Sequence, residues 1–108
     1  GVSSSAIQVI FDDVVGALAG GTFDARDDRH ISWTPGVVDE QGWTESAELV
    51  AETLEGLIKI HAASAKRLAK SGDEGIPATA VLMNYEGLSP EAKAAKGRKK
   101  GRAKKATK

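Results

Sequence analysis

The 108-residue sequence contains no cysteine, which excludes a disulfide framework and a thiolate metal site. Aromatic residues are scarce as well, because two Trp, two Phe and one Tyr make up only 5% of the chain. Much of the remaining apolar content is Ala and Val, whose small side chains bury little surface. We therefore expect one small domain with a thin hydrophobic core, which self-association or a partner would complete.

Long apolar runs are also missing. No uninterrupted apolar stretch approaches 18 residues, because Asp12 and Asp13 interrupt the first one, and no signal peptide is recognisable. We expect a soluble protein without membrane insertion, either intracellular (cytoplasmic) or part of a virion.

The formal net charge of zero hides an uneven charge distribution. Residues 91–108 contain nine Lys and Arg and a single acid, Glu91, whereas residues 1–90 contain six basic and fourteen acidic residues. The net charges of the two parts are therefore about +8 and −8. We predict a small acidic helical domain at 1–90, followed by a basic Lys/Arg/Ala/Gly tail at 91–108.

The strongest periodic pattern predicts a long amphipathic helix over about residues 44–71, and hence a mainly α fold. Apolar positions recur there every three or four residues for about seven turns, and an alanine-rich stripe lies beside them. Thr44 is suited to cap the first turn, and Gly72 follows the last turn. Such a face suits packing against another helix. The predicted helix interface consists of Val50, Leu54, Leu57, Ile58, His61 and Leu68.

The charged residues of this helix are sorted by sign. Four Glu occupy its first half, between residues 45 and 55, and four Lys and Arg occupy residues 59–70. The helix dipole favours this order only within one turn of each end, so it does not explain the middle of the helix. We hypothesise an antiparallel helix contact that crosses near Leu57, between two copies or with another helix of an assembly. The alternative is that the face packs only on other segments of the same chain.

Two apolar segments flank the long helix. The first predicts a helix over about Ser5–Ala19, with Gly20 after it, although a strand over residues 6–11 competes because several β-branched residues occur there. The second, residues 76–88, fits a short strand or a short helix equally well.

The end of the sequence carries a helix-start signal. Ser89, Pro90 and Glu91 are suited to the cap, the first position and the first turn of a helix. Beyond about Lys96 no apolar residue is larger than Ala, so we expect this part to be disordered unless something binds it.

Residues 22–43 form a long stretch without periodicity. A connection of about 20 residues is normally either functional or stabilised by something outside the chain. Trp33 and Trp43 are its predicted anchors. Either they fold back on the chain's own core or they meet a neighbouring subunit.

Few residues are suited to catalysis or metal binding. The two histidines, His30 and His61, lie 31 residues apart in the sequence. The acidic group at residues 24–28 lacks the glycine and the bidentate acid of a calcium loop. Neither a glycine-rich phosphate loop nor a nucleophile elbow is present. We therefore predict no enzymatic activity, no cofactor, no metal and no small-molecule substrate.

The basic tail is the strongest functional signal. Its Lys and Arg are interleaved with Gly and Ala, so they can neutralise phosphates but cannot stack on bases. Nucleic acid and an acidic protein surface are both suitable partners, whereas a membrane would be held weakly because apolar anchors are missing. The predicted polyanion contacts are Lys93, Lys96, Arg98, Lys99, Lys100, Arg102, Lys104, Lys105 and Lys108.

Two functions fit this layout. The first is a structural, self-associating subunit of a larger assembly, such as a phage head, neck or tail, whose tail docks on nucleic acid or acidic neighbours. The second is a stand-alone, nucleoid-type nucleic-acid-binding protein with an acidic dimerisation body. Because the acidic body would repel DNA, we favour the first.

Overall fold

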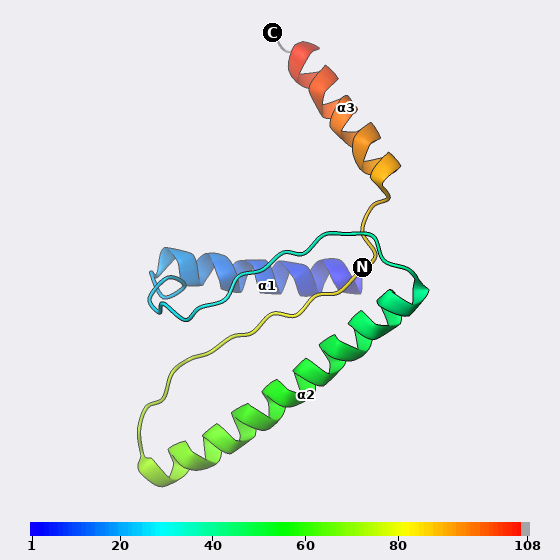
Figure 1. The fold of residues 1–108 in the computed structure, drawn as a ribbon. Helices are drawn as coiled ribbons and strands as arrows, with labels where there is room; N and C mark the ends of the chain where they lie inside the picture. Colours follow the sequence, from blue (N-terminus) through cyan, green and yellow to red (C-terminus); the bar gives the residue numbers. More distant parts are fainter. Residues whose placement is uncertain (107–108) are drawn as a thin grey trace.

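Three helices make up most of the chain in the computed structural model, which describes the backbone of residues 1–106 and the side chains of residues 1–98 (Figure 1). Helix α1 spans Val2–Ala19, helix α2 spans Glu40–Ser71 and helix α3 spans Pro90–Ala106. The described residues contain no strand. The predicted mainly helical fold is therefore confirmed.

Helix α2 begins four residues before the predicted start. Asp39 is its N-cap, and the Asp39 carboxylate accepts a hydrogen bond from the backbone N–H of Gly42 at 2.7 Å. The predicted cap at Thr44 is wrong, because an aspartate cap offsets the low helix propensity of Gly42 in the first turn. At its other end, α2 stops before Gly72, whose left-handed φ of 74° lets its N–H bond the carbonyl of Leu68 at 2.9 Å.

The segments on either side of α2 differ from the predictions in detail. Helix α1 begins at Val2 rather than Ser5, and the competing strand at residues 6–11 is not formed. Residues 72–89 are neither helix nor strand. Gly75, with a φ of +79°, and Pro77 oppose a helix at the start of this segment, and within the described structure no strand pairs with it.

Helix α3 begins as its sequence indicates. The Ser89 hydroxyl accepts a hydrogen bond from the Ala92 N–H at 3.1 Å, and Pro90 occupies the first helical position. The helix continues to Ala106, whereas we expected disorder beyond Lys96. Ala, Lys and Arg are all strong helix formers, and in this segment they outnumber the two glycines.

The two connections run back along the molecule, each returning from the end of one helix toward the start of the next (Figure 1). The first follows α1, the second passes between α1 and α2, and α3 projects away from both. The radius of gyration is 19.3 Å, whereas a compact domain of this length has a value of about 13 Å. The helices and connections are therefore spread out rather than packed around a common centre.

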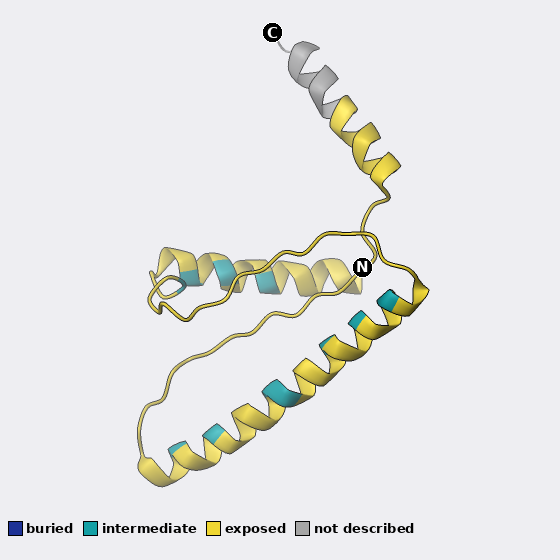
Figure 2. Cartoon of the chain, viewed as in Figure 1, coloured by how far each residue is buried: buried dark blue, intermediate teal, exposed yellow. Residues whose placement is uncertain are grey.

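Side-chain burial is low throughout residues 1–98. No residue among the described side chains, 1–98, is buried, and the half-buried ones lie mainly along one face of α1 and one face of α2 (Figure 2). The accessible surface of the chain is 9998 Å², whereas a compact protein of this mass exposes about 5,700 Å². The excess is therefore about 4,300 Å², and the thin core expected from the sequence is not assembled in residues 1–98.

The cap of α2 provides a direct test of this fold. We expect Asp39→Ala to destabilise the start of α2 by about 1 kcal/mol, because the Gly42 N–H loses its acceptor. Amide hydrogen exchange should accelerate over residues 40–44. Thr44→Ala is the matched control and should leave that exchange unchanged. Faster exchange in the Thr44 variant alone would show that Thr44, and not Asp39, caps the helix.

Candidate functional site

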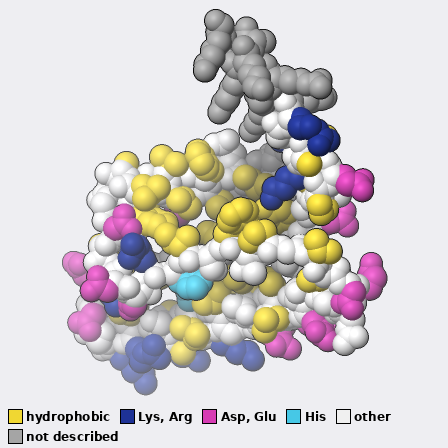
Figure 3. All heavy atoms as spheres, turned by 45° about the horizontal axis from the view of Figure 1, so that its top comes forward, with side chains coloured by type: hydrophobic (Ala, Val, Ile, Leu, Met, Phe, Trp, Pro, Cys, Tyr) yellow, Lys and Arg dark blue, Asp and Glu magenta, His cyan; other side chains and the backbone are white. Residues whose placement is uncertain are grey.

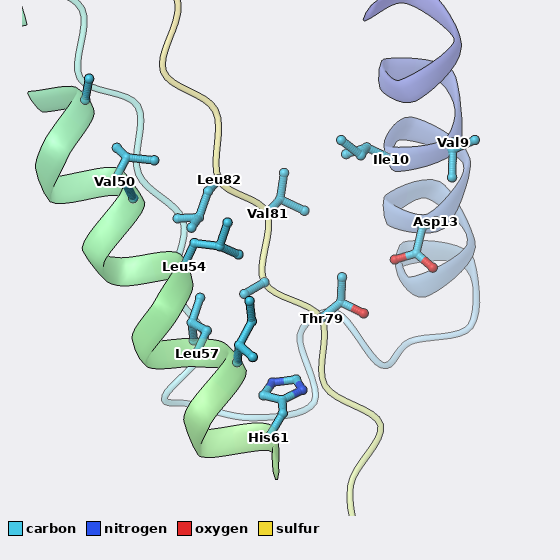
Figure 4. A pocket seen from close by; sticks show the side chains of 14 residues that line it. Val9, Ile10, Asp13, Val50, Leu54, Leu57, His61, Thr79, Val81 and Leu82 are labelled. Carbon is cyan, nitrogen blue, oxygen red and sulfur yellow. The ribbon is translucent and has the colours of Figure 1, made fainter. Parts of the chain in front are cut away.

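An apolar groove of about 830 Å³ lies between α1 and α2 (Figure 4). Val81 and Leu82 of the second connection lie between the two helices and form part of its lining. Both helices also contribute, α2 through Val50, Leu54, Leu57, Ile58 and His61, and α1 through Val9, Ile10 and Asp13. Five of the six predicted interface residues therefore line one groove.

The α2 wall of the groove is accessible to solvent. Leu54 is 51% exposed and Ile58 59% exposed, while Val50 and Leu57 are half-buried. Figure 3 shows apolar side chains gathered around a hollow on one face of the molecule, with charged side chains near its edges. A groove with this lining is suited to another apolar helix face rather than to a polar ligand.

The sixth predicted interface residue, Leu68, lies outside the groove and is half-buried by its own chain. A Cβ atom built on Gly75 would lie 2.9 Å from the Leu68 Cδ1 atom, so a side chain there would displace that of Leu68, and the φ of +79° also favours glycine at this position. Gly75 thus brings the second connection back against the end of α2.

Leu49 and Ile60 are exposed apolar residues of α2 that lie outside the predicted interface. Leu49 is 64% exposed and Ile60 60% exposed, and neither lines the groove. With Thr53 and Gly56 they follow the spacing 4, 3, 4, so they form a separate helical stripe. That spacing is visible in the sequence but is obscured by the stronger stripe beside it.

The predicted loop anchors are not buried. Trp33 is 78% exposed, and its ring centroid lies 5.8 Å from the Nζ atom of Lys93 at the start of α3. Trp43 lies in the first turn of α2 rather than in the predicted loop, because that helix begins at Glu40. It is 38% exposed and lines a second hollow of about 570 Å³, between residues 34–43 and residues 84–90. An exposed cation–π contact contributes only about 0.5–1 kcal/mol, so it holds α3 to the first connection weakly.

The acidic residues of the first connection form ion pairs with arginines of the same connection. Arg29 pairs with Asp24 at 2.8 Å, and Arg26 pairs with Asp28 at 3.0 Å. The hydrogen bond from Arg26, together with its positive charge, lowers the pKa of Asp28. Within the described part of the chain, no three His, Asp or Glu side chains are arranged to hold a metal ion.

The predicted polyanion contacts lie on α3 as far as the structure describes them. Lys93, Lys96 and Arg98 are exposed. Lys108 lies outside the described residues, and the side chains of the following residues are also outside them, although their backbone belongs to α3: Lys99, Lys100, Arg102, Lys104 and Lys105. Positive charge on a helix that projects from an acidic body is suited to a partner with phosphates or carboxylates.

Helix α1 is long and apolar enough to span a membrane by length and composition, whereas we expected no such segment. Its 18 residues have a mean hydropathy of 1.4, which meets that criterion by length and composition. It nevertheless carries Asp12 and Asp13 in its middle, and its length of about 27 Å is slightly below the thickness of the hydrocarbon core. A single weakly apolar helix of this kind is consistent with a soluble protein.

No known protein family, curated protein or solved structure matches this chain. Function is therefore inferred from the groove, the other exposed apolar faces and the charge of α3.

If α3 binds polyanions, K93Q/K96Q/R98Q should weaken binding to a short DNA duplex. The slope of log Kobs against log salt should fall by up to about 2.7, because each phosphate contact contributes about 0.9. The matched control, K66Q/R67Q/K70Q, removes the same charge from α2 and should leave the slope nearly unchanged. Equal losses in the two variants, measured by fluorescence anisotropy, would show that α3 has no special role.

Proposed function

We propose that this protein is a non-enzymatic structural subunit of a larger assembly, such as a phage head, neck or tail. Neighbouring subunits cover its apolar faces, and α3 docks on nucleic acid or on an acidic protein surface. The observation that carries the proposal is the absence of any buried residue among the described side chains, residues 1–98.

The exposed apolar residues support this proposal because they occur on α1, on α2 and in both connections. Phe11 on α1 is 60% exposed, Ile31 in the first connection 69% and Tyr85 in the second 69%. Small proteins are only marginally stable even with a complete core, so a chain that leaves such residues in water gains little from folding alone. Covering these faces with neighbours supplies the missing hydrophobic stabilisation.

The size of the exposed surface favours several neighbours. The excess of about 4,300 Å² over a compact chain is several times the roughly 800 Å² that each partner buries in an ordinary interface. Part of this excess belongs to the projecting helix α3, but the large exposed apolar side chains are distributed over α1, α2 and both connections, so one flat contact would leave many of them uncovered. A subunit enclosed within a particle has several neighbours, and they contact it on different sides.

The second candidate is a stand-alone nucleic-acid-binding protein, because α3 projects from the body where it is free to lie along a polyanion (Figure 1). The net charge of about −8 on residues 1–90 opposes it, since DNA would be repelled from any surface that α3 does not cover. A stand-alone protein also needs a folded body of its own.

The proposal is tested on the isolated chain. We expect light scattering to show self-association that increases with concentration, and thermal unfolding of the dilute chain to be broad and weakly cooperative. A compact monomer with sharp unfolding at all concentrations would overturn the proposal. If that monomer bound DNA with a steep salt dependence, the stand-alone function would be favoured instead.

A further inference from the structure

A stripe on the side of α2 away from the groove is exposed along the middle and the second half of the helix. Leu49 is 64% and Ile60 60% exposed, and Thr53 and Ala63 are exposed as well. Figure 1 shows α2 at the edge of the molecule, with α1 on one side of it only. The residues of this outer stripe follow the spacing 4, 3, 4, 3, 4: Leu49, Thr53, Gly56, Ile60, Ala63 and Arg67.

Two members of the outer stripe suit a close helix contact. The Thr53 hydroxyl donates a hydrogen bond to the Leu49 carbonyl at 2.9 Å, so Thr53 can leave water with its donor satisfied. A Cβ atom built on Gly56 would meet nothing within 4 Å, so no described neighbour requires glycine there. Glycine weakens the middle of a helix, and close approach of a second helix at Gly56 gives this residue a structural reason.

The charged residues along one flank of the outer stripe change sign at its centre. Glu45, Glu52, Lys59 and Lys66 are spaced by seven residues, so they follow the stripe along one edge. All four are exposed, and among the described side chains none of them takes part in an ion pair. Glu52 and Lys59 have their midpoint between residues 55 and 56, and so do Glu45 and Lys66. Each acid is thus matched by a base at the same distance beyond one point.

This flank is complementary to itself in an antiparallel pair. When two copies of α2 pack about a two-fold axis, residues equally distant from the centre come to the same height, and the same flank of both helices lies on one side of the pair. Glu45 then meets Lys66 of the second copy, and Glu52 meets its Lys59. Two-fold symmetry repeats both pairs, which gives four attractive contacts.

We propose that the outer stripe of α2 packs antiparallel on the outer stripe of a second copy. Ile60 then lies close to Leu49 of the second copy, and Gly56 close to its Thr53. This inference rests on the proposed function, because it assigns the first of the neighbours that cover the chain. The occupant is a second copy rather than an unrelated helix because the complementary charges belong to one flank of one helix.

The proposed contact uses a different face of α2 from the interface predicted from the sequence. Five predicted residues line the groove, and α2 contributes no charged side chain to that groove. The charges that select a partner flank the outer stripe instead. A parallel pair in register would set Arg67 beside Arg67 and would leave the flanking residues without partners of opposite sign, so charge selects the antiparallel arrangement.

Charge reversal gives the central test. In E45K/E52K the flank becomes entirely basic, and in K59E/K66E it becomes entirely acidic, so each variant should lose at least about tenfold in dimer affinity. An equimolar mixture should restore association as a heterodimer, because every flanking pair is then complementary. Restoration on mixing also shows that the separate variants had not simply misfolded. Analytical ultracentrifugation measures all three samples.

The matched control is E48K/E55K, which makes the same change in net charge on the same helix. Glu48 and Glu55 each lie three residues after a flanking acid, so they point away from the outer stripe, and neither lines the groove. The control should dimerise like the natural chain. Mixed with K59E/K66E, it should restore less association than E45K/E52K does, although the net charges are the same. Equal weakening or equal restoration by the control would overturn the proposed contact.

Introduced cysteines report the orientation without interference, because the chain has none of its own. A short thiol crosslinker should join E45C to K66C in a mixture. It should not join E45C to itself, because 21 residues of helix, about 32 Å, separate the two sites in the antiparallel pair. Crosslinking of E45C to itself would show a parallel pair and would overturn the inference.

Monomeric behaviour of the natural chain at all concentrations would also overturn the inference. Broad unfolding of that monomer would leave the proposed function standing with other partners, whereas sharp unfolding of a compact monomer would overturn both.

Discussion

Apolar surface that the chain cannot cover by itself is the constraint on which the rest of the structure depends. Helix α2 is 32 residues long, and its apolar face runs over most of that length. Among the described residues, the segment that returns along α2 is the extended connection at residues 72–89, and an extended segment covers only a narrow strip, as at the contact between Gly75 and Leu68. The remaining faces of α1 and α2 stay in water. Folding of the body is therefore expected to be coupled to association, with the hydrophobic effect acting mainly between chains.

Local signals allowed part of this fold to be predicted from the sequence. The end of α2 at Gly72 and the start of α3 at Ser89 depend on residues adjacent in the chain, so both could be predicted. Periodicity also identified five residues of the groove. The close approach of Gly75 to Leu68 is a tertiary contact, and it could not be predicted because it depends on the path of residues 72–89. The start of α2 at Glu40 was not predicted because Gly42 is a poor helix former. The predicted helix therefore began after Gly42, and Asp39 was not recognised as the cap.

The charge layout adds a second constraint on association. The basic residues of α3 and the acidic residues of the body lie in the same chain, yet α3 projects away and contacts the first connection through Lys93 and Trp33. Because interactions between exposed charges are screened beyond about 8–10 Å, the body does little to neutralise the far end of α3. The positive charge of α3 would therefore be available to bind a neighbouring acidic body or a phosphate backbone.

The two kinds of contact would divide the tasks of assembly between them. Exposed ion pairs contribute only about 0.2–1 kcal/mol each, so charge would select a partner and its orientation more than it would hold a complex together. The affinity of the proposed contacts would come from exposed apolar side chains, such as Leu54 and Ile58, leaving water. One contact of ordinary size covers about 800 Å² on each partner, which is too little for the apolar residues of two helices and two connections. The proposed assembly would therefore use several surfaces of the chain, including the groove, the stripe that contains Leu49 and Ile60, and the basic helix α3.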